Sequence, residues 1–322
     1  MVLLGLTLAG CAPGAAGPGG CTLTQRADLP LTLRRDVPLV HATIDGAAVT
    51  LILDTGAQTT LLTDAAVTRL HLARDDAAHG ARILGVGPAA AVSDADAARL
   101  DLGRVVLRNR PVIVAGFALA SDDRTVPDGL LGDDILSQYD LDLDLPDGRA
   151  TLYRARDCPG AAPPVVGDWT AVVAERTPRG QLRVPMTIDG QTLGAIVDTG
   201  SETTTVAVAA LPRLHMTEAM LAGDPRLRVR GMSEDATLVH VHRFDELRIG
   251  PLSYRHPYIP VAPLPDFLGD GLLGADVLRL HRVWLSWASA RIWIDTARRA
   301  AYQEKSRAVA ANDIKMSAGP SR

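Results

Sequence analysis

Two aspartates occupy matching places in this chain, each directly after a short apolar segment. Asp54 follows residues 51–53 and Asp198 follows residues 195–197, and each aspartate begins the tripeptide Asp-Thr-Gly. A carboxylate that comes directly after a buried strand, twice in one chain, indicates two acids that face one another. Two carboxylates about 3 Å apart cannot both ionise cheaply, so such a pair shares one proton and titrates as a unit. We therefore predict a catalytic pair made of Asp54 and Asp198.

Such a pair can hydrolyse a peptide bond without a metal ion or another cofactor. The ionised carboxylate takes a proton from a water molecule, and the protonated carboxyl donates to the carbonyl oxygen of the bond that breaks. The residues beside the aspartates can support this chemistry, because glycine permits the close approach of two loops and threonine hydroxyls can bridge them. These supporting residues are Thr55 and Gly56 in the first tripeptide and Thr199 and Gly200 in the second.

The sequence segments that must position the pair each occur twice in the chain. Residues 43–46, Thr-Ile-Asp-Gly, recur at 187–190, and the two Asp-Thr-Gly tripeptides share the same offset of 144. Further along, residues 129–136 recur at 271–278 with six of eight positions identical. Because order and spacing are preserved, the sequence predicts an internal duplication.

Each unit is predicted to be mostly β-structure. Asp-Gly pairs between apolar runs predict hairpin turns, and they stand at residues 45–46, 147–148 and 189–190. The segment 141–145 alternates leucine with aspartate, which predicts a strand with one buried face and one face in water. Short helices are expected over residues 64–70 and 133–137.

Together these motifs resemble those of the retropepsin-like aspartic peptidases. The resemblance rests on an apolar-apolar-Asp-Thr-Gly-Ala/Ser element, a glycine-containing middle segment and a late apolar-apolar-Gly-x-Asp element. It covers nearly all of residues 33–153 and 182–294. Those enzymes are small β-folds that normally dimerise to assemble one site. The resemblance therefore implies an all-β fold in which two retropepsin-like β-barrel lobes, with short helices, are fused as a pseudo-dimer. We expect a monomer with one site, and a homodimer whose lobes pair between chains is the alternative.

The resemblance also implies a β-hairpin flap over the substrate in each lobe. Glycines at a moving hairpin tip act as hinges and permit close approach of the backbone. Pro88 follows the first tip and Glu234 follows the second, so both depart from the usual glycine-richer pattern and are expected to differ. The flap candidates are Gly85, Val86 and Gly87 in the first lobe and Gly231, Met232 and Ser233 in the second.

The first residues resemble a bacterial lipoprotein signal. Residues 2–10 form an apolar run that is too short to span a bilayer and ends directly before Cys11, although no lysine or arginine precedes the run. The resemblance implies a signal peptide over residues 1–10, lipidation of Cys11 and a flexible tether over residues 11–22. The protein is then expected to be exported and lipid-anchored in the bacterial cell envelope, facing the periplasm, with the lipid anchor as its contact with the membrane.

The other two cysteines, Cys21 and Cys158, bracket the first repeat. In an oxidising compartment they could form a disulfide that ties the ends of this lobe together, and the alternative is two unpaired thiols. The expected divisions of the chain are a first lobe over residues 23–158, a linker rich in Pro, Gly and Ala over 159–174, a second lobe over 175–298 and a disordered tail over 299–322.

Composition and the remaining motifs narrow the class of function. A net charge of −4 and 47% apolar residues describe an ordinary soluble protein, with no indication of a nucleic-acid partner. His240 and His242 lack a third ligand at a recognisable metal-binding spacing, so no metal site is expected. The sequence therefore predicts an aspartic endopeptidase that acts on peptide or protein substrates without a cofactor. The alternative is a catalytically silent module that keeps the fold in order to bind extended peptides.

Overall fold

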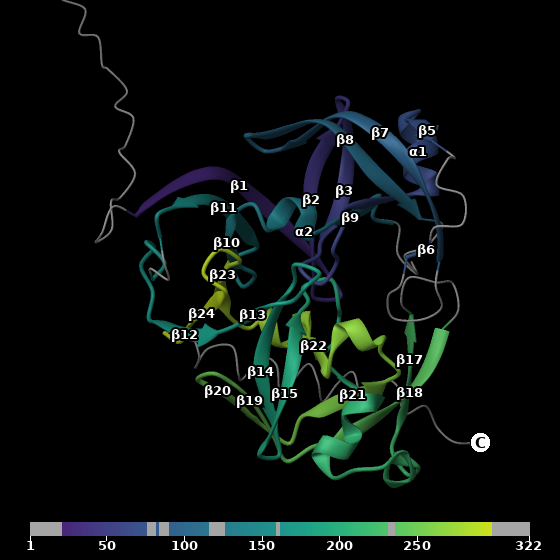
Figure 1. The fold of residues 1–322 in the computed structure, drawn as a ribbon, viewed down its shortest axis with the longest axis vertical. Coiled ribbons are helices and arrows are strands. Elements are labelled where there is room, and N and C mark those ends of the chain that lie inside the picture. The colour runs from purple at the N-terminus through teal and green to yellow at the C-terminus, as the bar shows by residue number, and fades with distance from the viewer. Residues whose placement is uncertain are drawn as a thin grey trace, which may run out of the picture.

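The computed structural model describes residues 21–75, 82–83, 90–115, 126–158, 162–230 and 236–297. These residues form two β-barrel lobes with a shared sheet between them, and the first lobe lies above the second in Figure 1. The second lobe repeats the order of elements of the first. The predicted fold class, an all-β pseudo-dimer with short helices, is therefore confirmed.

The first lobe is a closed barrel of six strands. These strands are β2 (Val37–Ile44), β3 (Ala47–Leu53), β4 (Leu61–Thr63), β7 (Ala90–Leu102), β8 (Val105–Ala115) and β9 (Gly129–Leu131). β3 pairs in parallel with β9, and β7 pairs with both β8 and β2, which closes the ring. Outside the ring lie helix α1 (Asp64–Leu70) and the short strands β5 (Ala73–Asp75) and β6 (Arg82–Ile83).

The second lobe repeats this arrangement, except that each of the two long strands of the first lobe corresponds to two shorter strands here. Its strands are β13 (Glu175–Arg176), β14 (Leu182–Ile188), β15 (Gln191–Val197), β16 (Thr205–Ala207), β17 (Arg226–Arg230), β18 (Ala236–Arg243), β19 (Glu246–Ile249), β20 (Leu252–Arg255), β21 (Tyr258–Ala262) and β22 (Gly271–Leu273). β18 and β19 together take the place of β7, and β20 and β21 take the place of β8.

In the described part of the second lobe, three segments are 3-10 helices. These are η2 (Val208–Leu214), η3 (Glu218–Leu221) and η4 (Asp266–Leu268). η2 stands at the position of α1, since 64 plus the offset of 144 is 208. Pro212 lies inside η2. Proline has no backbone N–H and disfavours an α-helix interior, which accounts for the different helix type.

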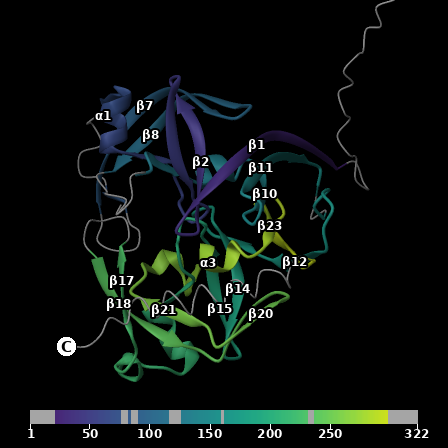
Figure 2. The same ribbon diagram turned by 180° about the vertical axis from the view of Figure 1, so that it is seen from behind.

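A sheet between the lobes takes strands from both halves of the chain (Figures 1 and 2). In spatial order they are β12 (Trp169–Val173), β24 (Arg291–Asp295), β23 (Arg282–Ser286), β10 (Asp140–Asp144), β11 (Arg149–Arg156) and β1 (Thr22–Arg34). The two repeats meet where β10 pairs with β23. β12 falls within residues 159–174, so part of the segment expected to be a linker is a strand of this sheet.

The expectation that β10 has one face in water is wrong, because all five of its residues are buried. β10 lies between β11 and β23, and aromatic and basic side chains cover the face that carries its aspartates. Arg282 donates two hydrogen bonds to Asp142, at 2.8 and 2.6 Å, and the indole of Trp284 donates to Asp140 at 3.3 Å. These carboxylates are buried because the other repeat supplies their partners.

The predicted turns and helices are present. Asp45 and Gly46 connect β2 to β3, and Asp189 and Gly190 connect β14 to β15. All four residues have positive φ, between 47° and 84°, as two-residue hairpin loops require. α1 has the expected bounds, and α2 (Asp133–Leu136) ends one residue before the expected limit.

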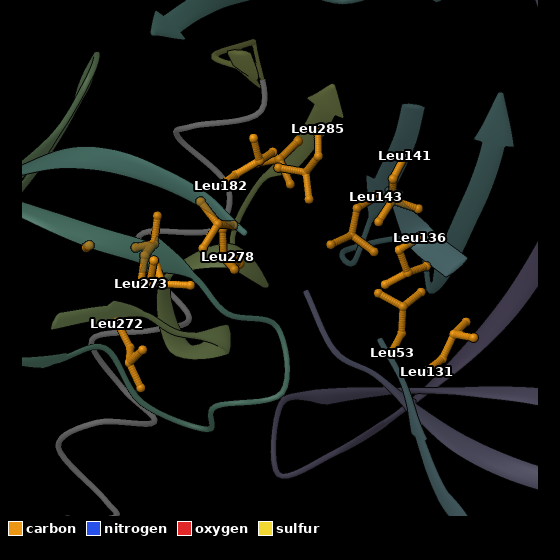
Figure 3. Close-up of a cluster of buried hydrophobic side chains, with 14 of the residues drawn as sticks. Leu53, Leu131, Leu136, Leu141, Leu143, Leu182, Leu272, Leu273, Leu278 and Leu285 are labelled. Atoms are coloured by element: carbon orange, nitrogen blue, oxygen red, sulfur yellow. The ribbon is translucent and has the colours of Figure 1, made fainter. Parts of the chain in front are cut away.

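One hydrophobic core runs through both lobes and the sheet between them. Figure 3 shows leucines of both repeats within this core, from Leu53 and Leu131 on one side to Leu272 and Leu273 on the other. Leu131 lies opposite Leu53 where β9 pairs with β3, and Leu273 lies opposite Val197 where β22 pairs with β15. The Leu-Leu-Gly segments at 130–132 and 272–274 therefore pack beside the strands that carry Asp54 and Asp198.

Cys21 and Cys158 form a disulfide with a Cα–Cα distance of 4.5 Å. It connects the residue before β1 to the segment after β11, so it closes the ends of the first repeat. Cys11, the expected signal and the expected tail lie outside the described residues. Within the described ranges, no helix has the length and apolar character needed to cross a membrane.

Candidate active site

Each predicted catalytic aspartate stands at the end of an interior strand. Asp54 follows β3 and its N–H donates to the carbonyl of Leu131 at 3.0 Å. Asp198 follows β15 and its N–H donates to the carbonyl of Leu273 at 3.0 Å. The parallel pairs β3–β9 and β15–β22 therefore hold both acids at the ends of buried strands, where the backbone has little freedom.

The two carboxyl groups face each other across the boundary between the lobes, and each interacts electrostatically with the other. The glycines show how close the loops come. A Cβ atom on Gly56 would lie 2.3 Å from Cγ of Asp198, and one on Gly200 would lie 2.4 Å from Cγ of Asp54. Each glycine therefore packs against the carboxyl of the opposite lobe, and any side chain there would displace it.

Thr55 and Thr199 join the two loops by reciprocal hydrogen bonds. The N–H of Thr55 donates to Oγ1 of Thr199 at 3.1 Å, and the N–H of Thr199 donates to Oγ1 of Thr55 at 3.2 Å. Each hydroxyl then donates across the boundary, Thr55 to the carbonyl of Val197 at 2.7 Å and Thr199 to that of Leu53 at 2.5 Å. Both threonines are fully buried. The lobes are thus connected directly beneath the acids.

Backbone amides fix one oxygen of each carboxyl. Oδ1 of Asp54 accepts from the N–H groups of Gly56 and Ala57, both at 2.9 Å. Oδ1 of Asp198 accepts from Gly200 at 3.0 Å and from Ser201 at 2.9 Å. This leaves the second oxygen of each group for the partner acid and for a reactant.

Burial raises the pKa of both aspartates above the ordinary value. For Asp198, the negative charge of Asp54 adds to burial and raises the pKa well above 3.8. The backbone hydrogen bonds described above act in the opposite direction in both loops, because they stabilise the ionised form. The pair therefore retains one proton at a pH at which isolated aspartates are both ionised.

Sequence reasoning did not assign a role to a second layer of residues that supports the loops. Oδ1 of Asp134 accepts from the N–H and the hydroxyl of Thr60, at 2.8 and 2.7 Å. Asp276 holds Thr204 in the same way, with both distances 2.8 Å. The sequence did contain an indication of this layer, because both repeats carry a Thr-Thr pair and a Gly-x-Asp segment at matching positions.

Asp133 breaks the symmetry of the repeat, because Ala275 stands at the equivalent place. Its side chain is 3% exposed, and neither carboxyl oxygen has a hydrogen-bond partner. The indole N–H of Trp287 faces this carboxyl and favours its ionised form, but it does not reach hydrogen-bonding geometry. Burial, followed by the charge of Asp54, raises the pKa of Asp133 to about 9. A third, neutral carboxyl therefore lies close to the pair.

The six flap candidates, Gly85 to Gly87 and Gly231 to Ser233, lie outside the described residues. The strands on either side of them are paired. Ile83 of β6 lies opposite Ala90 of β7, and Arg230 of β17 lies opposite Ala236 of β18.

The two histidines of β18 have separate surroundings. Nδ1 of His242 lies 2.8 Å from Oδ2 of Asp224, whereas Nδ1 of His240 has no hydrogen-bond partner. Over the part of the chain that the structure describes, no three potential ligand side chains gather as a metal site requires.

Comparison with known proteins agrees with this geometry. A family model described as aspartyl protease matches the chain twice, over residues 40–135 and 184–277. Each match includes one Asp-Thr-Gly tripeptide and the Gly-x-Asp segment that supports it. No curated protein matches the sequence. The two matches together cover more than half of the chain, which therefore belongs to the aspartyl protease family and contains the family domain twice.

Proposed function

We propose that this protein is an aspartic endopeptidase whose single active site is formed by Asp54 and Asp198. One observation carries the proposal: the two carboxyls face each other across the lobe boundary, each against the glycine of the opposite loop, on loops that are joined by Thr55 and Thr199. A protein that only binds peptides has no need to hold two like charges together, because their proximity costs free energy.

The proposed mechanism uses a water molecule held between the two carboxyls. The ionised carboxylate removes a proton from this water as its oxygen attacks the carbonyl carbon of the substrate. The protonated carboxyl donates its proton to the carbonyl oxygen, which gives a neutral tetrahedral intermediate. The carboxyl that received the water proton then protonates the leaving nitrogen as the C–N bond breaks. At the same time one hydroxyl of the intermediate gives its proton back to the other carboxylate and becomes the carbonyl of the product acid. The pair ends with one proton, as it began.

The backbone and threonine hydrogen bonds support this mechanism by fixing the acids before the substrate binds. Four main-chain N–H groups orient the two carboxyls, and the threonines prevent the loops from separating. A site that is already oriented does not lose free energy to reorganisation during the reaction.

We further propose that the protein acts outside the cytoplasm as an anchored monomer on peptide or protein substrates. The disulfide between Cys21 and Cys158 suits an oxidising compartment. Residues 1–11 resemble a lipoprotein signal that ends in a cysteine that would be lipidated. Both acids of the site come from one chain, so a second copy is not required.

The experiment compares the native protein with Asp54→Asn and Asp198→Asn on a denatured protein substrate. Both variants should lose cleavage and retain the native far-ultraviolet circular dichroism spectrum. Asp245→Asn is the matched control, because this aspartate is 84% exposed and distant in sequence from both loops. Inhibition of the native protein by a pepstatin-like compound should accompany cleavage. Full activity in either asparagine variant would refute the single site.

Mixing the two inactive variants tests whether the active site forms within a single chain. If lobes exchanged between chains, native pairs of acids would form and activity would return. We expect the mixture to remain inactive. Binding of peptides by the native protein without any cleavage, over the range from acidic to neutral pH, would favour the silent module instead.

A further inference from the structure

The loops of the two aspartates are nearly identical in sequence but are not held in the same way. Gln181, which immediately precedes β14 in the second lobe, is fully buried. Its Nε2 donates to the carbonyl of Gly56 at 2.6 Å, across the boundary between the lobes. The hydroxyl of Thr177 lies 3.3 Å from Oε1 and donates to it. A carbonyl can only accept, so this pair of contacts settles the orientation of the amide.

The carbonyl that Gln181 holds belongs to the peptide group that supports Asp54. The C=O of Gly56 and the N–H of Ala57 are the two ends of one peptide group, and this N–H donates to Oδ1 of Asp54 at 2.9 Å. A hydrogen bond to the carbonyl polarises the peptide group and strengthens the bond that its N–H donates. Gln181 is therefore linked to the carboxylate of Asp54 through a single peptide group.

The position equivalent to Gln181 in the first lobe carries no side-chain amide. In the other loop the peptide group of Gly200 and Ser201 supports Asp198, with the N–H of Ser201 at 2.9 Å from Oδ1. The offset of 144 places Val37 at the position of Gln181, and the side chain of valine has no donor. The asymmetry thus comes from one substitution between the two repeats.

We propose that Gln181 is a positioning residue that makes the two aspartates unequal, so that Asp54 is the ionised base and Asp198 carries the shared proton. The inference rests on the proposed function, because it assigns roles within the same pair. The charge of Asp54 also acts on Asp133, whose pKa of about 9 keeps that carboxyl neutral at lower pH, so Asp133 adds no negative charge beside the pair there.

The test follows the two carboxyls directly, by carbon-13 NMR of protein labelled at aspartate, with Asp54→Asn and Asp198→Asn used to assign the signals. In the native protein Asp54 should titrate at a lower pH than Asp198. Gln181→Met keeps the volume of the side chain and removes its donor, so the two titrations should move closer together by about 0.3 pH units, or about twofold in proton affinity. Val37→Gln adds a hydrogen-bond donor at the equivalent position of the first lobe, and it should also reduce the difference between the two titration midpoints.

An unchanged gap in Gln181→Met, or an Asp198 that titrates below Asp54 in the native protein, would overturn the inference. If Gln181→Met does not fold, Thr177→Val decides, because it leaves Gln181 in place and removes the hydroxyl that orients it. A smaller shift in the same direction is expected there, and no shift counts against the proposal. The titration needs no cleavage, so a protein without peptidase activity would refute the proposed function and leave this test valid. In an active protein, Gln181→Met should shift the acidic limb of the pH profile of kcat/KM to higher pH by the same amount.

Discussion

Replacing Asp133 with asparagine should stabilise the protein, and the gain should increase with pH. The carboxyl of Asp133 is 3% exposed and its oxygens lack hydrogen-bond partners, so the folded state strongly prefers its neutral form. Asparagine has nearly the same shape and never ionises. The variant therefore removes the cost of keeping an acid protonated within the folded protein.

The size of the effect follows from the two pKa values. The pKa of this carboxyl is about 9 in the folded protein and has the ordinary value of 3.8 when it is exposed by unfolding. Between these values the folded state binds one proton that the unfolded state has lost, so stability falls by about 1.4 kcal/mol for each pH unit gained. From pH 5 to pH 7 this group alone should cost about 2.7 kcal/mol. The contribution is absent below about pH 4, where both states are protonated.

Urea denaturation of the native protein and of Asp133→Asn at pH 5, 6 and 7 measures this slope. The difference in unfolding free energy should grow steadily in favour of the variant, by about 2.7 kcal/mol over the range. Asp157→Asn is the control, and its exposed side chain should give a difference that does not change with pH. Ala275→Asp places an acid at the equivalent position of the other lobe and should add a second penalty of the same sign. A gain in Asp133→Asn that is equal at pH 5 and pH 7 would refute the reasoning.

Three further predictions concern the loops and the disulfide. Thr199→Val leaves a buried N–H and a buried carbonyl of the first lobe without partners, and should cost about 2 to 4 kcal/mol of unfolding free energy in urea, whereas Thr199→Ser should cost much less. Gly56→Ala places a Cβ 2.3 Å from the opposite carboxyl and should abolish cleavage of a peptide substrate, while Gly223→Ala, where a Cβ meets nothing within 4 Å, should leave kcat/KM unchanged. Cys158→Ser opens a loop with a sequence separation of 137 and should cost about 4 to 5 kcal/mol by the chain-entropy model, so a reductant should lower the melting temperature of the native protein and not that of the variant.

Several features of the site could be predicted because they depend on short stretches of chain. Glycines beside the acids, threonines that can bridge two loops and Asp-Gly turns are local requirements, and each occurs in both repeats. The bounds of α1 agreed with the prediction for the same reason, since Thr63 caps its first turn through the N–H of Ala66.

The features that could not be predicted depend on what the other lobe places nearby. The alternation of leucine and aspartate in β10 is the pattern of a strand with one face in water, yet Arg282 and Trp284 of the second repeat cover that face. No local pattern contains this information, because the two segments are about 140 residues apart in the chain.

The amino-acid sequence alone determined that one unit occurs twice and that Asp54 and Asp198 are equivalent members of a pair. Only the tertiary structure decided how that equivalence is broken. Gln181 reaches the loop of Asp54 from the other lobe, and Asp133 is enclosed against Trp287. The physical reason is that a repeat specifies the shape of each lobe, whereas hydrogen bonds and burial at the boundary depend on the residues that the two shapes bring into contact.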